Sequence, residues 1–181
     1  MIFEKTNIDG VRIIKPEIME DDRGGFYRYF CKKEFADIHN KEFVQMNHSI
    51  NKRKGTLRGL HYQKEPYGEA KLIRCVRGSI LDVFVDLRTG SPTFLHWNSQ
   101  IISDSDHTMI FLPEGIAHGF ITLEDNTHVN YHHTEFYNPK AEGGFKYNDP
   151  TLSINWEIAP IVISERDKNH PYIGDFKGIE L

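Results

Sequence analysis

The sequence predicts an all-β fold, a jelly-roll barrel or sandwich with a few short helices. First, its 181 residues fit a single domain spanning residues 1–181, because a chain of this size buries about 70% of its unfolded surface. Second, apolar residues gather in short β-rich runs separated by turn residues, whereas helical periodicity is scarce. Third, prolines and glycines are scattered, so no linker or repeat divides the chain.

The expected elements follow in chain order. Residues 32–40 hold the one helical pattern, with Phe35 and Ile38 on its apolar face. Residues 72–77 and 79–86 flank Gly78 and predict a β-hairpin. Many short strands at regular spacing indicate a barrel with a ligand-sized interior, lined by alternate residues of each strand. The remaining strands are expected at residues 94–102, 108–113, 119–123 and 128–137, after a turn at residues 90–93.

Composition and charge exclude several classes of protein. Twenty-two basic residues against 26 acidic ones give a net charge of −4, so we expect neither a nucleic-acid partner nor a membrane partner. No apolar run approaches the roughly 20 residues that cross a bilayer, and we expect no signal peptide at the N-terminus. Cys31 and Cys75 are the only cysteines, which predicts buried free thiols in a cytoplasmic protein rather than a disulfide scaffold.

A first histidine motif occupies residues 113–120, which read PEGIAHGF. Proline and glycine set a turn, and His118 follows as the next strand begins. This arrangement resembles the PxGxxH motif of the cupin superfamily, whose histidine points into a β-barrel. The alternative interpretation is a turn followed by a half-buried structural histidine.

A second motif occupies residues 55–63, which read GTLRGLHYQ. In an extended strand His61 shares one face with Gly59, where the missing side chain leaves space for a ligand, while Arg58 lies on the other face. Gln63 stands where the cupin metal site needs a second histidine. We therefore expect no metal.

Taken together, the motifs resemble one family along nearly the whole chain. They occur in order between Phe3 and Asp175, so the chain is similar to the dTDP-4-dehydrorhamnose 3,5-epimerases and their relatives, which act on nucleotide-activated 4-keto sugars. The family implies a cupin-like jelly roll. The matching motifs are RGLHYQ (58–63), KLIR (71–74), VFVDLR (83–88), GSPT (90–93), AHGF (117–120), DRGGF (22–26), VQMNHS (44–49) and NDPTL (148–152).

The resemblance assigns three catalytic roles. Epimerisation beside a ketone needs a base, a group that stabilises the enolate, and an acid on the opposite face, but no redox cofactor or metal. His61 matches the base, since an imidazole titrates at about pH 6.5. Asp167 matches the carboxylate that orients it, and Tyr131 matches the proton donor, since a phenol with a pKa of about 10 keeps its proton at neutral pH. Without the family, Asp167 reads as a solvated loop residue and Tyr131 as a barrel-lining aromatic.

The resemblance also implies a nucleotide-sugar substrate, no cofactor and a homodimer whose N-terminal strands are exchanged. Lys71 is the candidate for enolate stabilisation, or else a solvated lysine at a strand end. Arginine guanidinium groups suit phosphate oxygens, and Tyr137 resembles the aromatic residue that stacks on the nucleobase. The full set of implied substrate-binding residues is Arg23, Phe26, Gln45, Asn47, Arg58, Lys71, His118, Tyr137, Glu142 and Arg166.

Several positions depart from the family pattern. Arg28 stands where a glutamate helps to recognise the base of thymidine-linked substrates, and Met46, Gly143 and Tyr147 replace an aspartate, an arginine and a tryptophan. Arg166 replaces a lysine. These departures leave open which nucleotide is carried (thymidine, cytidine or guanosine) and whether C3, C5 or both are inverted.

Other functions stay open from the sequence. A 5-only epimerase or a 3,4-ketoisomerase would use a similar pocket, although Tyr131 with the His61–Asp167 pair favours epimerisation. A metal-dependent cupin oxygenase is another alternative, and His61, His118 and His133 with a water would separately make a sensible catalytic zinc site. A non-catalytic sugar-binding jelly roll is a further alternative. We expect His133 on the same inward face as Tyr131, as a packed or polar pocket residue.

Overall fold

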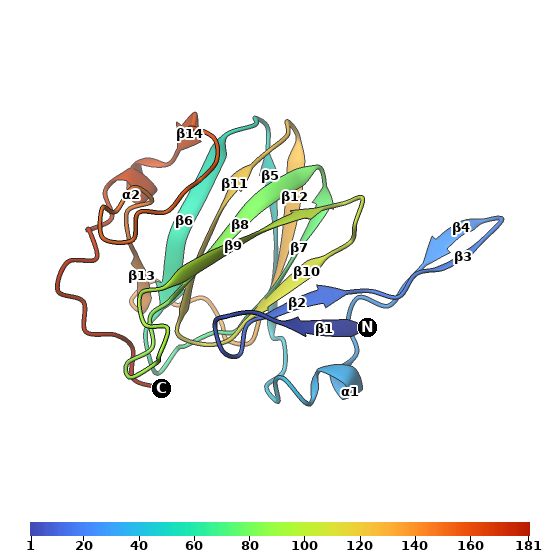
Figure 1. The fold of residues 1–181 in the computed structure, drawn as a ribbon, viewed down its shortest axis with the longest axis horizontal. Coiled ribbons are helices and arrows are strands. Elements are labelled where there is room, and N and C mark those ends of the chain that lie inside the picture. The colour runs from blue at the N-terminus through green and yellow to red at the C-terminus, as the bar shows by residue number, and fades with distance from the viewer.

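Two β-sheets packed face to face form the body of the protein in the computed structural model, which describes residues 1–181 (Figure 1). The strands pair antiparallel throughout, except that β14 runs parallel to β6. The first sheet has the order β1 (Ile2–Lys5), β2 (Arg12–Lys15), β10 (Met109–Leu112), β7 (Lys71–Arg77), β12 (Thr127–His133) and β5 (Gln45–Asn51). The second has the order β13 (Glu142–Gly144), β6 (Thr56–Gln63), β11 (Ile116–Thr122), β8 (Ser79–Asp86) and β9 (Trp97–Ser103), with β14 (Val162–Ile163) beside β6.

Strand β8 shows how side-chain alternation builds the core. Ile80 and Phe84 point between the sheets, where they join the interior cluster with Ile73 and Val129. Leu81, Val83 and Val85 point the other way, into a second cluster beneath the C-terminal segment. A strand buried on both faces holds its position firmly, because slipping by one residue would exchange the two sets of contacts. The predicted all-β jelly-roll class is confirmed.

The predicted hairpin around Gly78 is wrong. Strand β7 pairs with β10 and β12 in one sheet, whereas β8 pairs with β11 and β9 in the other. Gly78 has a φ of +75°, and a Cβ on it would lie 2.7 Å from Thr127 Oγ1. One residue is too short for the two-residue turns that close hairpins, so the chain crosses from one sheet to the other.

The helices are shorter than the sequence pattern indicates. Helix α1 covers Lys32–Phe35 rather than residues 32–40, because two apolar positions and no side-chain cap give little support for a longer helix. Phe35 is buried and Ile38 packs against its cluster, so the predicted apolar face is correct. Helix α2 covers Glu165–Lys168 beside β6. Neither helix is long and apolar enough to span a bilayer.

An arm near the N-terminus leaves the body of the sandwich. Strands β3 (Met19–Asp21) and β4 (Gly24–Phe26) form a two-stranded hairpin that projects away from both sheets (Figure 1). Every residue of both strands is exposed. A two-stranded hairpin is marginally stable alone in water, so its extended shape suits contact with another surface. Cys75 is buried as predicted, but Cys31, just before α1, is only half-buried.

Candidate active site

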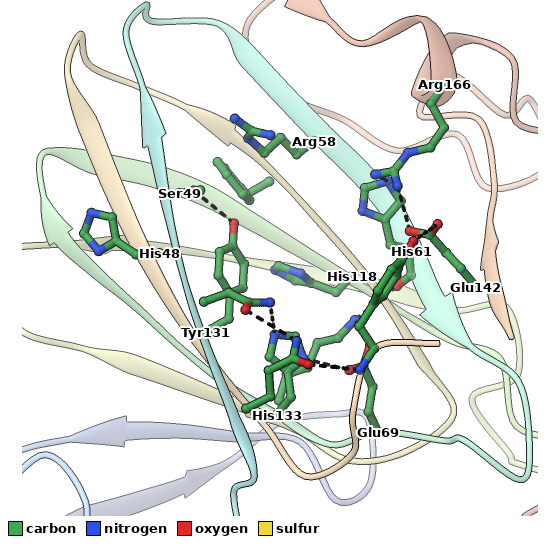
Figure 2. Close-up of a pocket in the computed structure, with 15 residues that line it drawn as sticks. His48, Ser49, Arg58, His61, Glu69, His118, Tyr131, His133, Glu142 and Arg166 are labelled. Carbon is green, nitrogen blue, oxygen red and sulfur yellow. Dashed lines mark hydrogen bonds and ion pairs between the residues drawn. The ribbon is translucent and has the colours of Figure 1, made fainter. Parts of the chain in front are cut away.

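The site is a cavity of about 270 Å³ that opens between the two sheets (Figure 2). Strands β5, β7 and β12 provide one wall, and β6 and β11 provide the opposite wall. The residues predicted for the site that line this cavity are Gln45, Asn47, Arg58, His61, Lys71, His118, Tyr131, Tyr137, Glu142 and Arg166.

His61 and Asp167 form the pair that the resemblance implied. His61 Nε2 lies 2.8 Å from Asp167 Oδ1. Helix α2 positions the carboxylate. The Ser164 hydroxyl caps this helix by accepting a hydrogen bond from the Asp167 backbone N–H at 3.1 Å, and the Gly59 N–H donates to the Asp167 carboxylate at 3.3 Å. Burial alone would raise the pKa of Asp167, but His61, the Gly59 N–H and the Arg166 charge lower it to about 2. The carboxylate therefore stays charged and orients the imidazole.

The predicted alternation along β6 is wrong between Arg58 and His61. Both side chains line the same cavity, although an unbroken strand would put residues three apart on opposite faces. The ladder with β11 shifts register between His118 and Phe120, and Gly59 adopts a φ of +121°. This β-bulge turns Arg58 to the side of His61. A Cβ on Gly59 would lie 2.5 Å from Gly119 Cα, so neighbouring backbone, not a ligand, fills the space at Gly59.

Tyr131 faces the cavity from the opposite wall, on β12. Its hydroxyl lies 3.3 Å from Ser49 Oγ, and burial raises its pKa, so the phenol keeps its proton. His118 lies on the His61 side, where the two residues are cross-strand partners. His118 Nε2 donates to Asp82 at 2.7 Å, and burial lowers the pKa of His118 and raises that of Asp82.

The mouth of the cavity is polar and linked by hydrogen bonds. Glu142 accepts from the Tyr137 hydroxyl at 3.0 Å and from Arg166 Nη1 at 2.8 Å. Arg166 Nη2 also lies 3.2 Å from His61 Nε2. Gln45 accepts from the Tyr137 backbone N–H at 3.0 Å. A cationic guanidinium thus lies between the mouth and the base, where it suits an anionic part of a ligand.

Two of the predicted site residues lie elsewhere in this chain. Arg23, whose side chain is 89% exposed, pairs with Asp21 on the projecting arm. Phe26 is 68% exposed and borders a separate hollow with Met1 and Arg28. Within a single chain, therefore, Arg23 and Phe26 do not line the cavity.

The three histidines of the zinc alternative do not form a ligand set. The one group of three side chains with metal-binding geometry is His61, Asp167 and His170. His133 instead pairs with Glu69, at 2.7 Å between Nδ1 and Oε2. Glu69 lines the cavity and was absent from the predicted site. The sequence held one signal for Glu69: it stands two residues before Lys71, and residues two apart lie on the same face of an extended chain.

Fold and site together define a cupin-like jelly-roll protein whose interior holds acid–base side chains on two facing walls. Comparison with known proteins places it more narrowly. A family model described as dTDP-4-dehydrorhamnose 3,5-epimerase matches residues 5–175. The epimerase of that name from Methanothermobacter thermautotrophicus is 44% identical over 92% of this chain and 91% of its own. The one from Sinorhizobium fredii is 39% identical over 94% of this chain and 89% of its own.

Solved structures agree with these sequence relatives. The dTDP-4-dehydrorhamnose 3,5-epimerase of Elizabethkingia anophelis superposes with a TM-score of 0.93 at 38% identity, covering 98% of each chain. The Legionella pneumophila dTDP-6-deoxy-D-glucose-3,5-epimerase, solved in complex with dTDP-4-keto-L-rhamnose, gives a TM-score of 0.90 at 37% identity, covering 96% of this chain and 93% of its own. The chain belongs to the dTDP-4-dehydrorhamnose 3,5-epimerase family, and it is an enzyme of the isomerase class.

Proposed function

We propose that the protein epimerises a nucleotide-diphospho-4-keto-6-deoxy sugar at C3, C5 or both. The observation that carries this proposal is that His61, held by Asp167, faces the same cavity as Tyr131 from the opposite sheet. A base and an acid on opposite faces of a bound ring are what inversion of a carbon requires. The names of the relatives supply the substrate class.

The proposed reaction begins with proton removal from a carbon beside the ketone. Because Asp167 engages Nε2 of His61, Nδ1 is left to take the proton. The electron pair of the broken C–H bond moves into the carbonyl and forms an enolate. Lys71, which lines the cavity next to His61, places an ammonium group where negative charge develops.

Inversion is completed on the opposite face. The enolate re-forms the ketone as the carbon takes a proton from the Tyr131 hydroxyl, and solvent then returns a proton to the tyrosine. Ser49 and Arg58 stand near the phenol, and Arg58 opposes the rise in its pKa. A cation beside the hydroxyl stabilises the tyrosinate that proton donation leaves behind.

The nucleotide half of the substrate is assigned to the mouth. Tyr137 offers an exposed ring for the base, and Arg166 offers a guanidinium for phosphate oxygens. We further propose a homodimer in which the projecting arm brings Arg23 and Phe26 to the partner's cavity, since both are remote from their own. Arg28, which follows the arm and donates to Glu34 of α1, replaces the glutamate that helps relatives to recognise thymidine, so the nucleotide is identified by experiment. Free cysteines support a cytoplasmic setting.

One experiment tests the function and the nucleotide together. Thymidine-, cytidine- and guanosine-linked 4-keto-6-deoxy sugars are each incubated in deuterated water, and NMR follows C3 and C5. We expect deuterium at an inverted carbon with one nucleotide, and loss of that signal in His61→Asn. His128→Gln, a histidine outside the cavity, is the matched control. A 3-keto product would identify a ketoisomerase, and intact binding without exchange would identify a sugar-binding protein; either result refutes the proposal.

A further inference from the structure

One histidine beside the His61–Asp167 pair has no part in the proposed reaction. His170 follows α2 by two residues, and its Nε2 atom lies 3.7 Å from Asp167 Oδ1. Its ring centroid is 5.6 Å from that of His61, with an interplanar angle of 70°. The ring packs on the backbone of Gly144, where an added Cβ would lie 2.5 Å from His170 Nε2. That nitrogen is buried and has no hydrogen-bond partner, so the protein leaves its bonding capacity unused.

His61, Asp167 and His170 have the spacing of a metal-binding set. One ligand atom from each of the three lies within 4.8 Å of the other two. Asp167 Oδ1 is 2.8 Å from His61 Nε2 and 3.7 Å from His170 Nε2. Ligand atoms placed tetrahedrally around zinc at roughly 2.1 Å are about 3.4 Å apart, so small side-chain movements would close the set. Two imidazoles and one carboxylate, with water in the fourth position, are ligands that zinc accepts in proteins.

A cation can reach these ligands and displace the arginine beside them. A hollow of about 330 Å³ between β6, β14 and α2 is lined by both His61 and Asp167, which gives a route to the pair in addition to the main cavity. Arg166 Nη2 lies 3.2 Å from His61 Nε2 and would repel a metal ion there. The Arg166 side chain is 52% exposed, however, and its Nη1 donates to Glu142 (Figure 2). The guanidinium can therefore leave the pair while Glu142 still holds it.

A metal ion at this place would disable the base. In the proposed reaction the Nε2–H of His61 donates to Asp167, which leaves the Nδ1 lone pair to take the substrate proton. A cation on Nε2 needs the lone pair of that atom, so the neutral imidazole must carry its proton on Nδ1 instead. No net proton is released, because one N–H bond is exchanged for the other. The nitrogen that should accept a proton from carbon then already holds one.

We propose that His61, Asp167 and His170 form an inhibitory site for a first-row dication such as Zn²⁺, which stops epimerisation by fixing the inactive tautomer of His61. The inhibition rests on the proposed function, because it needs His61 to act as the base through Nδ1. The ligand set itself does not rest on the proposed function.

The test first removes a competing pair of histidines. His48 Nε2 lies 3.0 Å from His128 Nδ1 in an exposed pair, which could also bind zinc. Zn²⁺ is therefore titrated into the His128→Gln protein, without substrate, in competition with a chromophoric chelator. We expect one Zn²⁺ per chain. Adding His170→Gln should weaken this binding at least about tenfold, because even changes outside the ligand shell cost metal sites about that much.

Two further measurements follow the tautomer and the inhibition. Imidazole NMR of the His128→Gln protein should show that Zn²⁺ shifts the nitrogen signals of His61 and His170 and moves His61 to its Nδ1–H form. In the deuterium exchange assay, Zn²⁺ should inhibit wild type and His128→Gln at the same concentration, and EDTA should restore exchange. His170→Gln should keep its metal-free exchange rate within about threefold and need at least about ten times more Zn²⁺ for the same inhibition.

The outcomes separate this inference from the proposed function. Zn²⁺ binding that is absent in His128→Gln, or that His170→Gln leaves unchanged, overturns the site and leaves epimerisation standing. Binding at the site with undiminished exchange overturns the inhibition. Absence of exchange in metal-free wild type, with every nucleotide, overturns epimerisation itself, while the zinc titration still decides the site because it uses no substrate. If His170→Gln fails to fold, NMR spectra in which Zn²⁺ leaves the His61 and His170 nitrogen signals unmoved would overturn the inference without that variant.

Discussion

Replacing Asp167 by asparagine tests whether the carboxylate charge, and not only its hydrogen bond, serves the base. Asparagine keeps the shape and an acceptor for the Gly59 N–H, which lies 3.3 Å away. What it removes is the anion 2.8 Å from His61 Nε2. The imidazolium that forms as the substrate loses its proton then has no counter-charge.

Two magnitudes bound the expected effect of Asp167→Asn. The pKa of Asp167, about 2 against an ordinary value of about 3.9, corresponds to about 2.5 kcal/mol of preference for the charged form, shared among His61 and the other partners. Coulomb's law at 2.8 Å with an effective dielectric constant of about 20 gives an upper bound of about 6 kcal/mol. Turnover should therefore fall between about 70-fold and about 2 × 10⁴-fold.

The assay is the rate of deuterium entry at C5 in deuterated water, with thermal unfolding measured alongside as a control for folding. If the pair acts as a unit, Asp167→Asn should cause no further loss in a His61→Asn background. A fall of less than about threefold in the single variant, or full additivity in the double variant, would refute the role of Asp167.

Three other predictions test the acid, the bulge and a structural carboxylate. Tyr131→Phe should still exchange substrate protons but form epimer about 10² to 10⁴ times more slowly, which NMR of product and label separates; equal loss of both would refute the assignment. Gly59→Ala should destabilise the fold by about 3 kcal/mol or more, since its φ is +121° and Gly119 Cα would lie 2.5 Å from the new Cβ; an unchanged urea midpoint would contradict this. Asp86 is buried and accepts a hydrogen bond from Arg88 at 2.8 Å. Burial alone would raise the pKa of Asp86, but the hydrogen bonds to its carboxylate lower that pKa to about 2. Its folded-state pKa lies below the unfolded value, so its stabilisation is present above about pH 4 and is lost as pH falls toward 2. Urea unfolding should show that loss in wild type and a flatter acid limb in Asp86→Asn, which should cost about 2 to 4 kcal/mol at pH 7.

Local patterns in the chain predicted the consecutive strands from β7 to β12, but not strands β1 to β5, β13 or β14. The interval 79–86 coincides with β8, because its apolar side chains alternate into two separate cores and allow no other register. The chemical identity of the site was also accessible, since the motif around His61 and the distant Asp167 carry the family resemblance. The structure brings these two together at 2.8 Å.

Which strands pair with each other was decided only by the tertiary structure. Strand β7 and strand β8 have similar patterns, and nothing local to Gly78 says that they belong to different sheets, because pairing depends on strands far along the chain. The bulge at Gly59 is likewise a product of packing against Gly119, and it moves Arg58 to the wall of His61.

The sequence by itself thus determined the fold class, the family and most side chains of the cavity, since hydrophobic alternation and short motifs are properties of neighbouring residues. The tertiary structure decided which walls those side chains share and that the His133 imidazole meets Glu69. Glu69 and His133 are 64 residues apart, so only the pairing of β7 with β12 brings their segments of the chain together. Contacts of that kind depend on the whole fold, and a linear pattern does not contain them.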